Sequence, residues 1–253
     1  MLSKRLIPCL LIDSGKLVKT SGLKNPKYIG DPINCCKLFS DLEADEIIII
    51  DISASKNNYI NFELLKNIAS ECFVPLTYGG GIKNIEDMKH LVGLGYEKFV
   101  INSACIDSNF SIIKESVNYF GSQSIIACCD IKKIGDDFKI FNYLENNFYE
   151  ISFQQYLANL TKVNIGEVLF HFVELEGTLN GLDKQSIEEI NKLSINKNIF
   201  MGGAKNFDEI KEIFNTGVDT IAVGSMFVFS GKKRGILINY LSENEKKIID
   251  NLK

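Results

Sequence analysis

The sequence has no tryptophan, two histidines and four prolines among its 253 residues, and it has no long apolar stretch. Its longest apolar runs, such as Leu6–Ile12 and Ile47–Ile50, are far shorter than the ~20 residues that a membrane-spanning helix needs. The first twelve residues also lack the length and the cleavage site of a secretory signal. With only His90 and His171 available, a histidine-rich metal site is excluded, and we expect neither a metal nor another cofactor.

Charge and cysteine usage exclude further classes of protein. Lysine and arginine number 28 against 32 acidic residues, a formal net charge of −4, which argues against nucleic acid or an anionic membrane as the main partner. The seven cysteines are an odd number, lie mostly in apolar segments and are never spaced Cys-x-x-Cys. Reduced thiols explain them best, so we expect a cytoplasmic protein.

Short apolar runs alternate with amphipathic stretches along the whole chain, and no proline- or serine-rich linker divides it. Runs that are apolar on both faces predict parallel strands, and the periodic stretches between them predict helices. The eight predicted strands are Leu6–Ile12, Ile47–Ile52, Val74–Tyr78, Phe99–Ile101, Ser124–Cys129, Val168–Val173, Ile199–Met201 and Thr220–Val223. The predicted helices are Asn34–Glu43, Phe62–Cys72, Ile85–Leu94, Ser111–Phe120, Phe153–Lys162, Lys184–Leu193 and Phe207–Asn215, with Leu237–Leu241 as a candidate for the last. Eight strands in about 250 residues predict a single α/β domain over residues 1–253, a (β/α)8 barrel.

An internal repeat supports a barrel built from two similar halves. At an offset of 122 residues, Gly80–Gly81 aligns with Gly202–Gly203, Lys83–Asn84 with Lys205–Asn206, Gly95 with Gly217, and Ser103 with Ser225. The alternative is that any two βα units share glycine and lysine by chance. A run of matches in one register favours duplication.

Each half of the repeat carries glycines at one predicted strand end and small polar residues at the next. Glycine allows backbone amides to approach a ligand closely, and a following helix N-terminus favours an anion. Loops after the seventh and eighth strands of such barrels often bind phosphate. The predicted phosphate-binding residues are Gly81, Asn102, Ser103, Gly202, Gly203, Gly224 and Ser225. Two such half-sites on one rim fit a substrate with a phosphate at each end; the alternative is that these glycines only form tight turns.

Four charged residues stand immediately before apolar strand runs: Arg5, Glu46, Lys98 and Glu167. Strand starts gather at one mouth of a parallel barrel, so these side chains can form a neutral ring there. Such a ring can close the barrel floor while a small neutral molecule passes. The alternative is a stabilising charge cluster with no gating role, because buried charges need partners in any case.

Several segments carry a more specific signal. They are Lys4–Leu10, Gly30–Pro32, Asp45–Glu46, Asp51–Ser55, Gly79–Ile82, Phe120–Gln123, Gly177–Thr178, Gly202–Ala204 and Gly224–Ser225. Together they resemble HisF, the cyclase subunit of imidazole glycerol phosphate synthase, over nearly the whole chain to about Phe229. In that family a glutaminase partner releases ammonia at the N-terminal face of the barrel, and the ammonia crosses it to react with a bis-phosphorylated ribulosyl substrate. The resemblance implies that the four floor residues gate ammonia, and that Lys19 in the loop after the first strand meets phosphate; a solvated loop lysine is the alternative.

The resemblance also implies two acid–base aspartates, at the ends of the first and fifth strands. Asp130 matches the second, but the first falls on Leu11, which cannot carry a proton. Polar family residues in the sixth and seventh strands fall on His171 and Met201, and a family aspartate is Glu176 here. His171 is either a donor to a ligand or a rim histidine with protein partners. Losing one acid–base partner commonly costs orders of magnitude in rate, so intact phosphate half-sites beside these departures indicate an altered reaction.

A divergent branch of the family is similar to this chain in Ile7–Leu11, Gly22–Tyr28, Gly30–Asn34 and Ala69–Phe73. Its members are associated with a HisH-like glutaminase and an N-acetyl-sugar amidotransferase in the synthesis of acetamidino sugars for surface polysaccharide or flagellar glycan. The resemblance implies a subunit that pairs with the glutaminase as a heterodimer and conducts ammonia. Two alternatives stay open: a working cyclase/lyase of histidine biosynthesis, and a catalytically silent barrel that scaffolds or activates a glutaminase.

Overall fold

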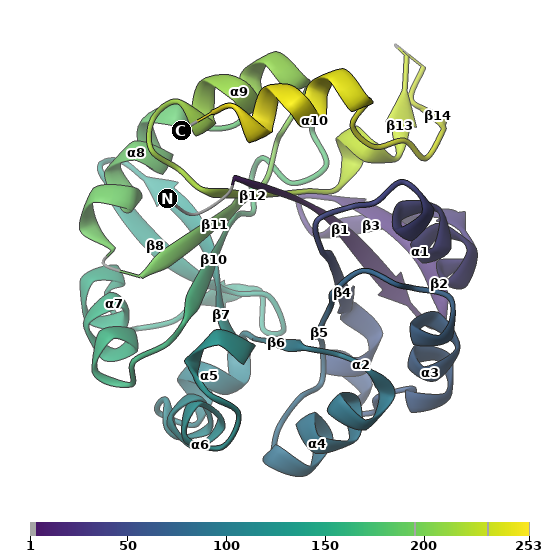
Figure 1. The fold of residues 1–253 in the computed structure, drawn as a ribbon. Helices are drawn as coiled ribbons and strands as arrows, with labels where there is room; N and C mark the ends of the chain where they lie inside the picture. Colours follow the sequence, from purple (N-terminus) through teal and green to yellow (C-terminus); the bar gives the residue numbers. More distant parts are fainter. Residues whose placement is uncertain (1–3, 195, 232, 253) are drawn as a thin grey trace.

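Eight parallel strands close into a barrel, and helices cover its outside (Figure 1). The computed structural model describes residues 4–194, 196–231 and 233–252. The strands follow the order β10-β11-β12-β1-β4-β5-β6-β7, and pairing of β7 with β10 completes the ring. The predicted (β/α)8 barrel is confirmed.

Each barrel strand overlaps one of the eight apolar runs of the sequence. The strands are β1 (Arg5–Asp13), β4 (Ile47–Asp51), β5 (Leu76–Gly79), β6 (Lys98–Ile101), β7 (Ile125–Ile134), β10 (Glu167–Phe172), β11 (Lys197–Met201) and β12 (Thr220–Val223). They contain many β-branched and aromatic residues, which pack well on a pleated surface buried on both faces.

The helices lie between the strands, and four of them have the bounds that the sequence predicts. They are α1 (Pro32–Asp41), α2 (Ile52–Asn57), α3 (Phe62–Ser70), α4 (Ile85–Leu94), α5 (Ser103–Asp107), α6 (Ser111–Phe120), α7 (Phe153–Lys162), α8 (Lys184–Leu193), α9 (Phe207–Phe214) and α10 (Glu243–Asp250). Two short 3-10 helices, η1 (Ser122–Ser124) and η2 (Ser225–Phe227), precede β7 and follow β12.

The alternation of side chains along the strands creates two separate apolar cores. Outward-facing residues such as Leu10 and Tyr78 pack with the helices in the larger core. Inward-facing residues fill the barrel lumen in a second, smaller core formed by Ile7, Cys9, Ile48, Val100, Ile126, Cys128, Leu169, Ile199 and Ala222. The lumen is therefore lined by apolar side chains along its middle layers.

The two halves of the sequence repeat have the same local geometry. Gly80 and Gly202 have φ values of 125° and 121°, which side-chain-bearing residues rarely adopt. Asn84 and Asn206 are the N-caps of α4 and α9, and each side chain accepts a hydrogen bond from the backbone N–H three residues later. The 122-residue offset thus relates two equivalent strand–turn–helix units.

Antiparallel hairpins extend two of the barrel strands beyond their carboxyl ends. β1 continues into β2 (Lys16–Ser21) and β3 (Lys24–Gly30), and β7 continues into β8 (Asp137–Asn142) and β9 (Asn147–Phe148). A small hairpin of β13 (Phe229–Ser230) and β14 (Gly235–Ile236) follows the last barrel strand. The hairpins place loop residues above the mouth of the barrel.

The candidate helix Leu237–Leu241 is wrong, because this segment is irregular and the last helix is α10. The hydroxyl of Tyr240 donates to the backbone oxygen of Leu6 at 2.6 Å, so this irregular segment is held against β1. Ser242 and Glu245 form a capping box that starts α10 at Glu243.

Candidate functional site

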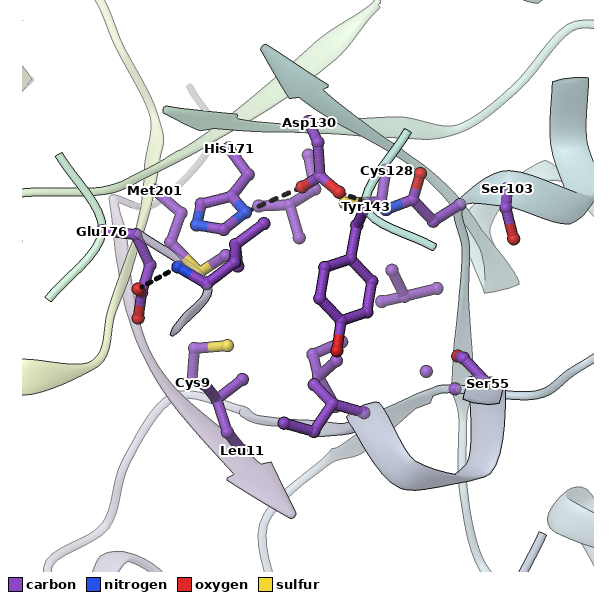
Figure 2. A pocket seen from close by; sticks show the side chains of 18 of the residues that line it. Cys9, Leu11, Ser55, Ser103, Cys128, Asp130, Tyr143, His171, Glu176 and Met201 are labelled. Atoms are coloured by element: carbon purple, nitrogen blue, oxygen red, sulfur yellow. Dashed lines mark hydrogen bonds and ion pairs between the residues drawn. The ribbon is translucent and has the colours of Figure 1, made fainter. Parts of the chain in front are cut away.

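A cavity of about 480 Å³ opens at the carboxyl ends of the barrel strands (Figure 2). It brings together every residue predicted to bind phosphate or exchange protons, from both halves of the repeat. These are Lys19, Gly81, Asn102, Ser103, Asp130, Gly202, Gly203, Gly224 and Ser225. The sequence thus placed these residues correctly on one face of the barrel, while their chemical roles stay predictions.

Asp130 is buried at the cavity wall, and both of its carboxylate oxygens have protein partners. Asn102 Nδ2 donates to Asp130 Oδ2 at 2.8 Å. His171 Nδ1 lies 2.8 Å from Asp130 Oδ1, and the close-up shows the imidazole and the carboxylate facing each other across neighbouring strands (Figure 2). The carboxylate is thus already engaged from two sides.

His171 reaches Asp130 because β10 pairs with β7, with His171 opposite Asp130 in the register. Burial lowers the pKa of His171, but the hydrogen bond to Asp130 and the charges of Asp130 and Glu176 outweigh that effect, so the pKa is raised overall. The other ring nitrogen, Nε2, is buried without a hydrogen-bond partner among the described residues.

Leu11 and Met201 give the cavity wall an apolar character. Leu11 is only 8% exposed and pairs with Ile50 on β4 and with Val18 on β2. It lines the cavity at the place where the family resemblance expects a carboxylate. A leucine side chain can neither donate nor accept a proton, so this position supplies no acid or base to the cavity.

Lys19 is buried on β2, and its ammonium group points into the barrel mouth. Lys19 Nζ donates to the backbone oxygen of Cys9 at 2.6 Å, and a Cβ atom added to Gly224 would lie 2.7 Å from Nζ. Burial lowers the pKa of Lys19. The cation therefore lies beside the predicted phosphate-binding residue Gly224, as a phosphate-contacting lysine would.

Glu176 fastens the β2–β3 hairpin over the cavity. Its two carboxylate oxygens accept hydrogen bonds from Thr20 Oγ1 at 2.9 Å and from the backbone N–H of Leu23 at 3.1 Å. The backbone N–H of Gly22 also donates to the backbone oxygen of Glu176 at 3.0 Å. Lys19 is held in place by this attachment of the hairpin.

The glycines at the mouth are positions of close backbone approach. A Cβ atom at Gly203, where φ is 94°, would lie 2.1 Å from the backbone oxygen of Gly181. A Cβ atom at Gly81 would lie 3.0 Å from the backbone oxygen of Ala54, and the Gly81 N–H donates to Ser55 Oγ at 3.1 Å. Side chains would thus distort both turns.

The four floor residues form a closed ring of ion pairs at the opposite end of the barrel. Arg5 contacts Glu46 at 3.0 Å and also Glu167, and Lys98 contacts Glu46 at 2.8 Å and Glu167 at 3.0 Å. Thr77 donates to Glu46 at 2.5 Å. Both carboxylates are nearly buried, with side-chain exposures of 3% for Glu46 and 8% for Glu167, so each has charged partners on two sides.

Along the barrel axis, the ring, the apolar lumen and the cavity are successive layers. Inward-facing residues of a strand recur every second position. On β10, Glu167 belongs to the ring, Leu169 to the lumen and His171 to the cavity. Along β6 the same order is Lys98 in the ring, Val100 in the lumen and, directly after the strand, Asn102 in the cavity, so apolar side chains separate the floor from the mouth on both strands.

Three features of the site were not predicted as functional from the sequence: the contact of His171 with Asp130, the attachment by Glu176, and Tyr143 above the cavity (Figure 2). His171 and Glu176 were visible only as departures from a family pattern. Tyr143 follows β8, a strand for which the apolar runs gave no signal.

The described part of the chain has neither a membrane-spanning helix nor a cluster of metal-binding side chains. None of its helices is both long and apolar enough to cross a membrane. Within the same ranges, no three histidine, cysteine or acidic side chains cluster as metal ligands would.

The chain matches one protein-family model and is similar to several known proteins over most of its length. The family model described as histidine biosynthesis protein matches residues 5–233. The chain is 37% identical over 248 residues to a protein of Pseudomonas aeruginosa provisionally named imidazole glycerol phosphate synthase subunit hisF2, covering 97% of this chain and 98% of that one. It is 37% identical over 231 residues to a protein of Campylobacter jejuni with the same provisional name, covering 91% and 92% of the two chains. It is 35% identical over 246 residues to imidazole glycerol phosphate synthase subunit HisF of Helicobacter hepaticus, covering 96% of each.

Proposed function

Because the chain belongs to the histidine biosynthesis protein family, we propose that it is the HisF-like barrel subunit of a glutamine-dependent complex, and that it conducts ammonia from a HisH-like glutaminase to its cavity. The observation that carries this proposal is the alignment of a charged ring, an apolar lumen and a polar cavity along one axis. Ammonia released into water at neutral pH would be mostly protonated. A route that excludes water keeps it nucleophilic.

The ion-pair ring suits a gate for a small neutral molecule. Its two cations and two carboxylates neutralise one another, so the floor carries no net charge from these four residues. Charged ammonium meets a much higher desolvation barrier in the apolar layers above the ring than neutral ammonia does. The apolar layers thus select for ammonia, and the neutral ring at their entrance holds no excess charge that would attract ammonium.

Exposed apolar residues around the floor support docking of a partner there. Phe73 is 89% exposed, and Leu42, Tyr119 and Leu193 are also exposed. All four lie in the last turn of a helix or between a helix and the next strand, which is the floor side of the barrel. Exposed apolar surface is one feature of protein–protein contact sites. We propose that the glutaminase covers this face as the second subunit of a heterodimer.

We propose further that the complex serves acetamidino-sugar synthesis for surface polysaccharide or flagellar glycan, together with an N-acetyl-sugar amidotransferase. Leu11 stands in the cavity wall where an ordinary cyclase has an aspartate, and two of the relatives are named hisF2 rather than HisF. The seven cysteines are all free, as expected in a reducing compartment such as the cytoplasm.

The second candidate function is the cyclase/lyase reaction of imidazole glycerol phosphate synthase. Asp130, Lys19 and the paired glycines of both repeat halves support it, because a bis-phosphorylated ligand would meet donors at both ends of the cavity. Assay of the chain with the ribulosyl substrate and ammonium salt, which needs no glutaminase, separates the two functions. Turnover near that of an ordinary cyclase would favour the second.

The experiment that tests ammonia passage replaces one ring residue in a reconstituted three-protein system. The system contains this chain, the HisH-like glutaminase and the N-acetyl-sugar amidotransferase. Lys98→Ala removes the cation between Glu46 and Glu167, and we expect glutamine hydrolysis to continue while ammonia leaks. Lys4→Ala is the matched control, because Lys4 is also buried near the floor but pairs with Asp219 outside the ring. The measurement is the ratio of glutamate formed to amidinated sugar formed.

A ratio that rises in Lys98→Ala and stays at one in Lys4→Ala supports the gate. An unchanged ratio in a folded Lys98→Ala protein contradicts it and leaves the ring a structural cluster. Glutaminase that is activated without any transfer of nitrogen would support the silent scaffold instead.

A further inference from the structure

We propose that His171 is the proton-transfer residue of the cavity, and that Asp130 is a positioning residue that fixes the orientation and the tautomer of its ring. The proposal rests on the proposed function for the identity of the nucleophile, ammonia. It assigns to a histidine the proton transfer that the strand-end aspartates were expected to perform.

The first argument is that Asp130 has no free carboxylate oxygen. Oδ2 accepts from Asn102 Nδ2, and Oδ1 faces His171 Nδ1, both at 2.8 Å. An ionised carboxylate accepts and cannot donate, so Nδ1 carries the hydrogen in the His171–Asp130 contact. This arrangement is the one in which a carboxylate orients an imidazole and stabilises the imidazolium that forms.

The second argument is the state of the other ring nitrogen. With the proton on Nδ1, Nε2 of neutral His171 has an available lone pair, and it is buried with no hydrogen-bond partner in the part of the chain that the structure describes. Leaving a buried polar atom unpaired costs about 1–3 kcal/mol, so such atoms need an explanation. Met201 lies opposite His171 in the strand register, and its unbranched side chain can move aside for a ligand at little cost.

The third argument is elimination among the buried titratable groups that line the cavity. Lys19 donates to a backbone oxygen, and both oxygens of Glu176 are occupied by the β2–β3 hairpin. Burial raises the pKa of Cys9 to about 11 and raises that of Cys128 well above its ordinary value, so both thiols stay protonated. Among the described buried titratable groups that line the cavity, His171 is the one whose ring nitrogen Nε2 has no hydrogen-bond partner and can accept a proton.

The position of His171 connects the lumen to the cavity. It stands two residues after Leu169, a member of the apolar lumen core, on the same face of β10. A nucleophile that leaves the lumen therefore meets the ring of His171 as one of the first polar groups. Two carboxylates, Asp130 and Glu176, favour imidazolium at this ring, and the Lys19 ammonium disfavours it.

The step we assign is the addition of ammonia to a carbonyl carbon of the bound ligand. The lone pair of ammonia forms a carbon–nitrogen bond while the π pair of the carbonyl moves to its oxygen. One proton leaves the new nitrogen for Nε2, giving imidazolium beside Asp130, and then passes from Nε2 to the oxygen. The product is a carbinolamine, and the histidine is regenerated. A ketone and an amide carbonyl are both compatible with this step.

The first test uses the fact that the chain has only two histidines. Nitrogen-15 NMR of the imidazoles, with His90→Gln for assignment, reports the tautomer of His171. We expect the neutral ring to carry its hydrogen on Nδ1, and Asp130→Asn to remove this preference. A neutral wild-type ring with hydrogen on Nε2 would overturn the proposal whatever the reaction proves to be.

The second test compares His171→Gln and His171→Asn with the wild type, using ammonium chloride as the nitrogen source with the ribulosyl substrate and in the three-protein sugar system. We expect kcat to fall about 100-fold or more, a KM for ammonium within about threefold, and loss of the pH limb that matches the NMR titration of His171. Asp130→Asn should shift that limb. If both His171 variants form product within about threefold of the wild-type rate, the inference about His171 is wrong. If the wild type forms no product in either system, the proposed function is wrong, and the tautomer measurement alone decides the inference about His171.

Discussion

His171 and Asp130 form a buried pair, so removing the Asp130 carboxylate should reveal how much it raises the pKa of His171. In Asp130→Asn the hydrogen-bonded charge that raises the pKa of His171 is lost, while the burial that lowers it remains. We therefore expect the pKa of His171 to fall below the ~6.5 of an ordinary histidine. An imidazole NMR titration of the variant and the wild type checks this, and an unchanged midpoint would show that Asp130 does not hold the ring.

The same pair predicts how stability depends on pH. Because the folded-state pKa of His171 is raised, its stabilising contribution is fully present below the unfolded value of ~6.5 and is lost as pH rises through the folded pKa. In Asp130→Asn the sign reverses, so this group should add stability as pH rises. Urea unfolding at a series of pH values measures both slopes, and parallel curves for the two proteins would contradict the assignment.

Leu11 gives a second prediction, which concerns the cyclase reaction. Leu11→Asp places a carboxylate where the family resemblance expects one, but the site is nearly buried between Val18 and Ile50. An unpaired charge there is unfavourable, and residues that act as a unit are not restored singly. We expect a less stable protein with cyclase activity still far below that of an ordinary cyclase, in an assay with ammonium salt that bypasses the glutaminase. Recovery of full activity would show that the other departures from the family pattern are neutral.

At the scale of the strand–turn–helix unit, the two glycines Gly203 and Gly217 form a natural control pair. Both have positive φ, 94° and 92°, so alanine is strained at each. A Cβ atom at Gly203 would collide with the backbone oxygen of Gly181 at 2.1 Å, whereas none of the described atoms lies within 4 Å at Gly217. We expect Gly217→Ala to cost about 1 kcal/mol, and Gly203→Ala to cost more and to weaken phosphate binding. Thermal unfolding and calorimetric titration with inorganic phosphate measure the two effects, and equal losses would contradict the assignment of Gly203 to the phosphate half-site.

The elements that sequence predicts well are those set by local periodicity. α4 and α8 have the expected bounds, since an amphipathic stretch and a cap residue lie within one segment. The apolar runs do not predict the β2–β3 and β8–β9 hairpins, because these strands contain fewer apolar residues and their turns, such as Gly22–Leu23, are short. The apolar run Leu237–Leu241 does not coincide with the last helix, because α10 is mostly charged and starts at the capping box of Ser242 and Glu245.

In the candidate site, as in the helices and hairpins, features set by a short segment can be predicted from the sequence, whereas contacts between distant segments cannot. Strand ends gather on one face, so Asp130 and Gly203 could be placed together from the sequence. The contact of His171 with Asp130 could not, because the residues are 41 positions apart and meet only through the pairing of β10 with β7. Register between distant strands is fixed by closure of the whole barrel, which no short pattern encodes.

At the scale of the whole molecule, the two ends of the barrel differ in character. The floor has a neutral ion-pair ring with exposed apolar residues around it, and the mouth has a cavity under two hairpins. A partner that supplies ammonia must reach the ring, whereas a phosphorylated ligand must reach the mouth. Because the two ends of the barrel differ, ammonia and the phosphorylated ligand would enter at opposite ends, separated by the length of the lumen.

A matched pair of surface substitutions tests which end the glutaminase covers. Phe73 lies between α3 and β5 on the floor side and is 89% exposed, and Tyr59 lies between α2 and α3 on the mouth side and is 67% exposed. Phe73→Asp places a charge in the proposed interface, where desolvation without a partner is costly, so we expect at least a tenfold weaker complex. Tyr59→Asp adds the same charge to the opposite face and should leave the affinity within about twofold of wild type.

Titration of labelled glutaminase with each variant, after thermal unfolding has shown that both are folded, gives the two dissociation constants. Weakening by Tyr59→Asp alone would place the partner at the mouth, where ammonia would not need the ring or the lumen, and the proposed route would be wrong.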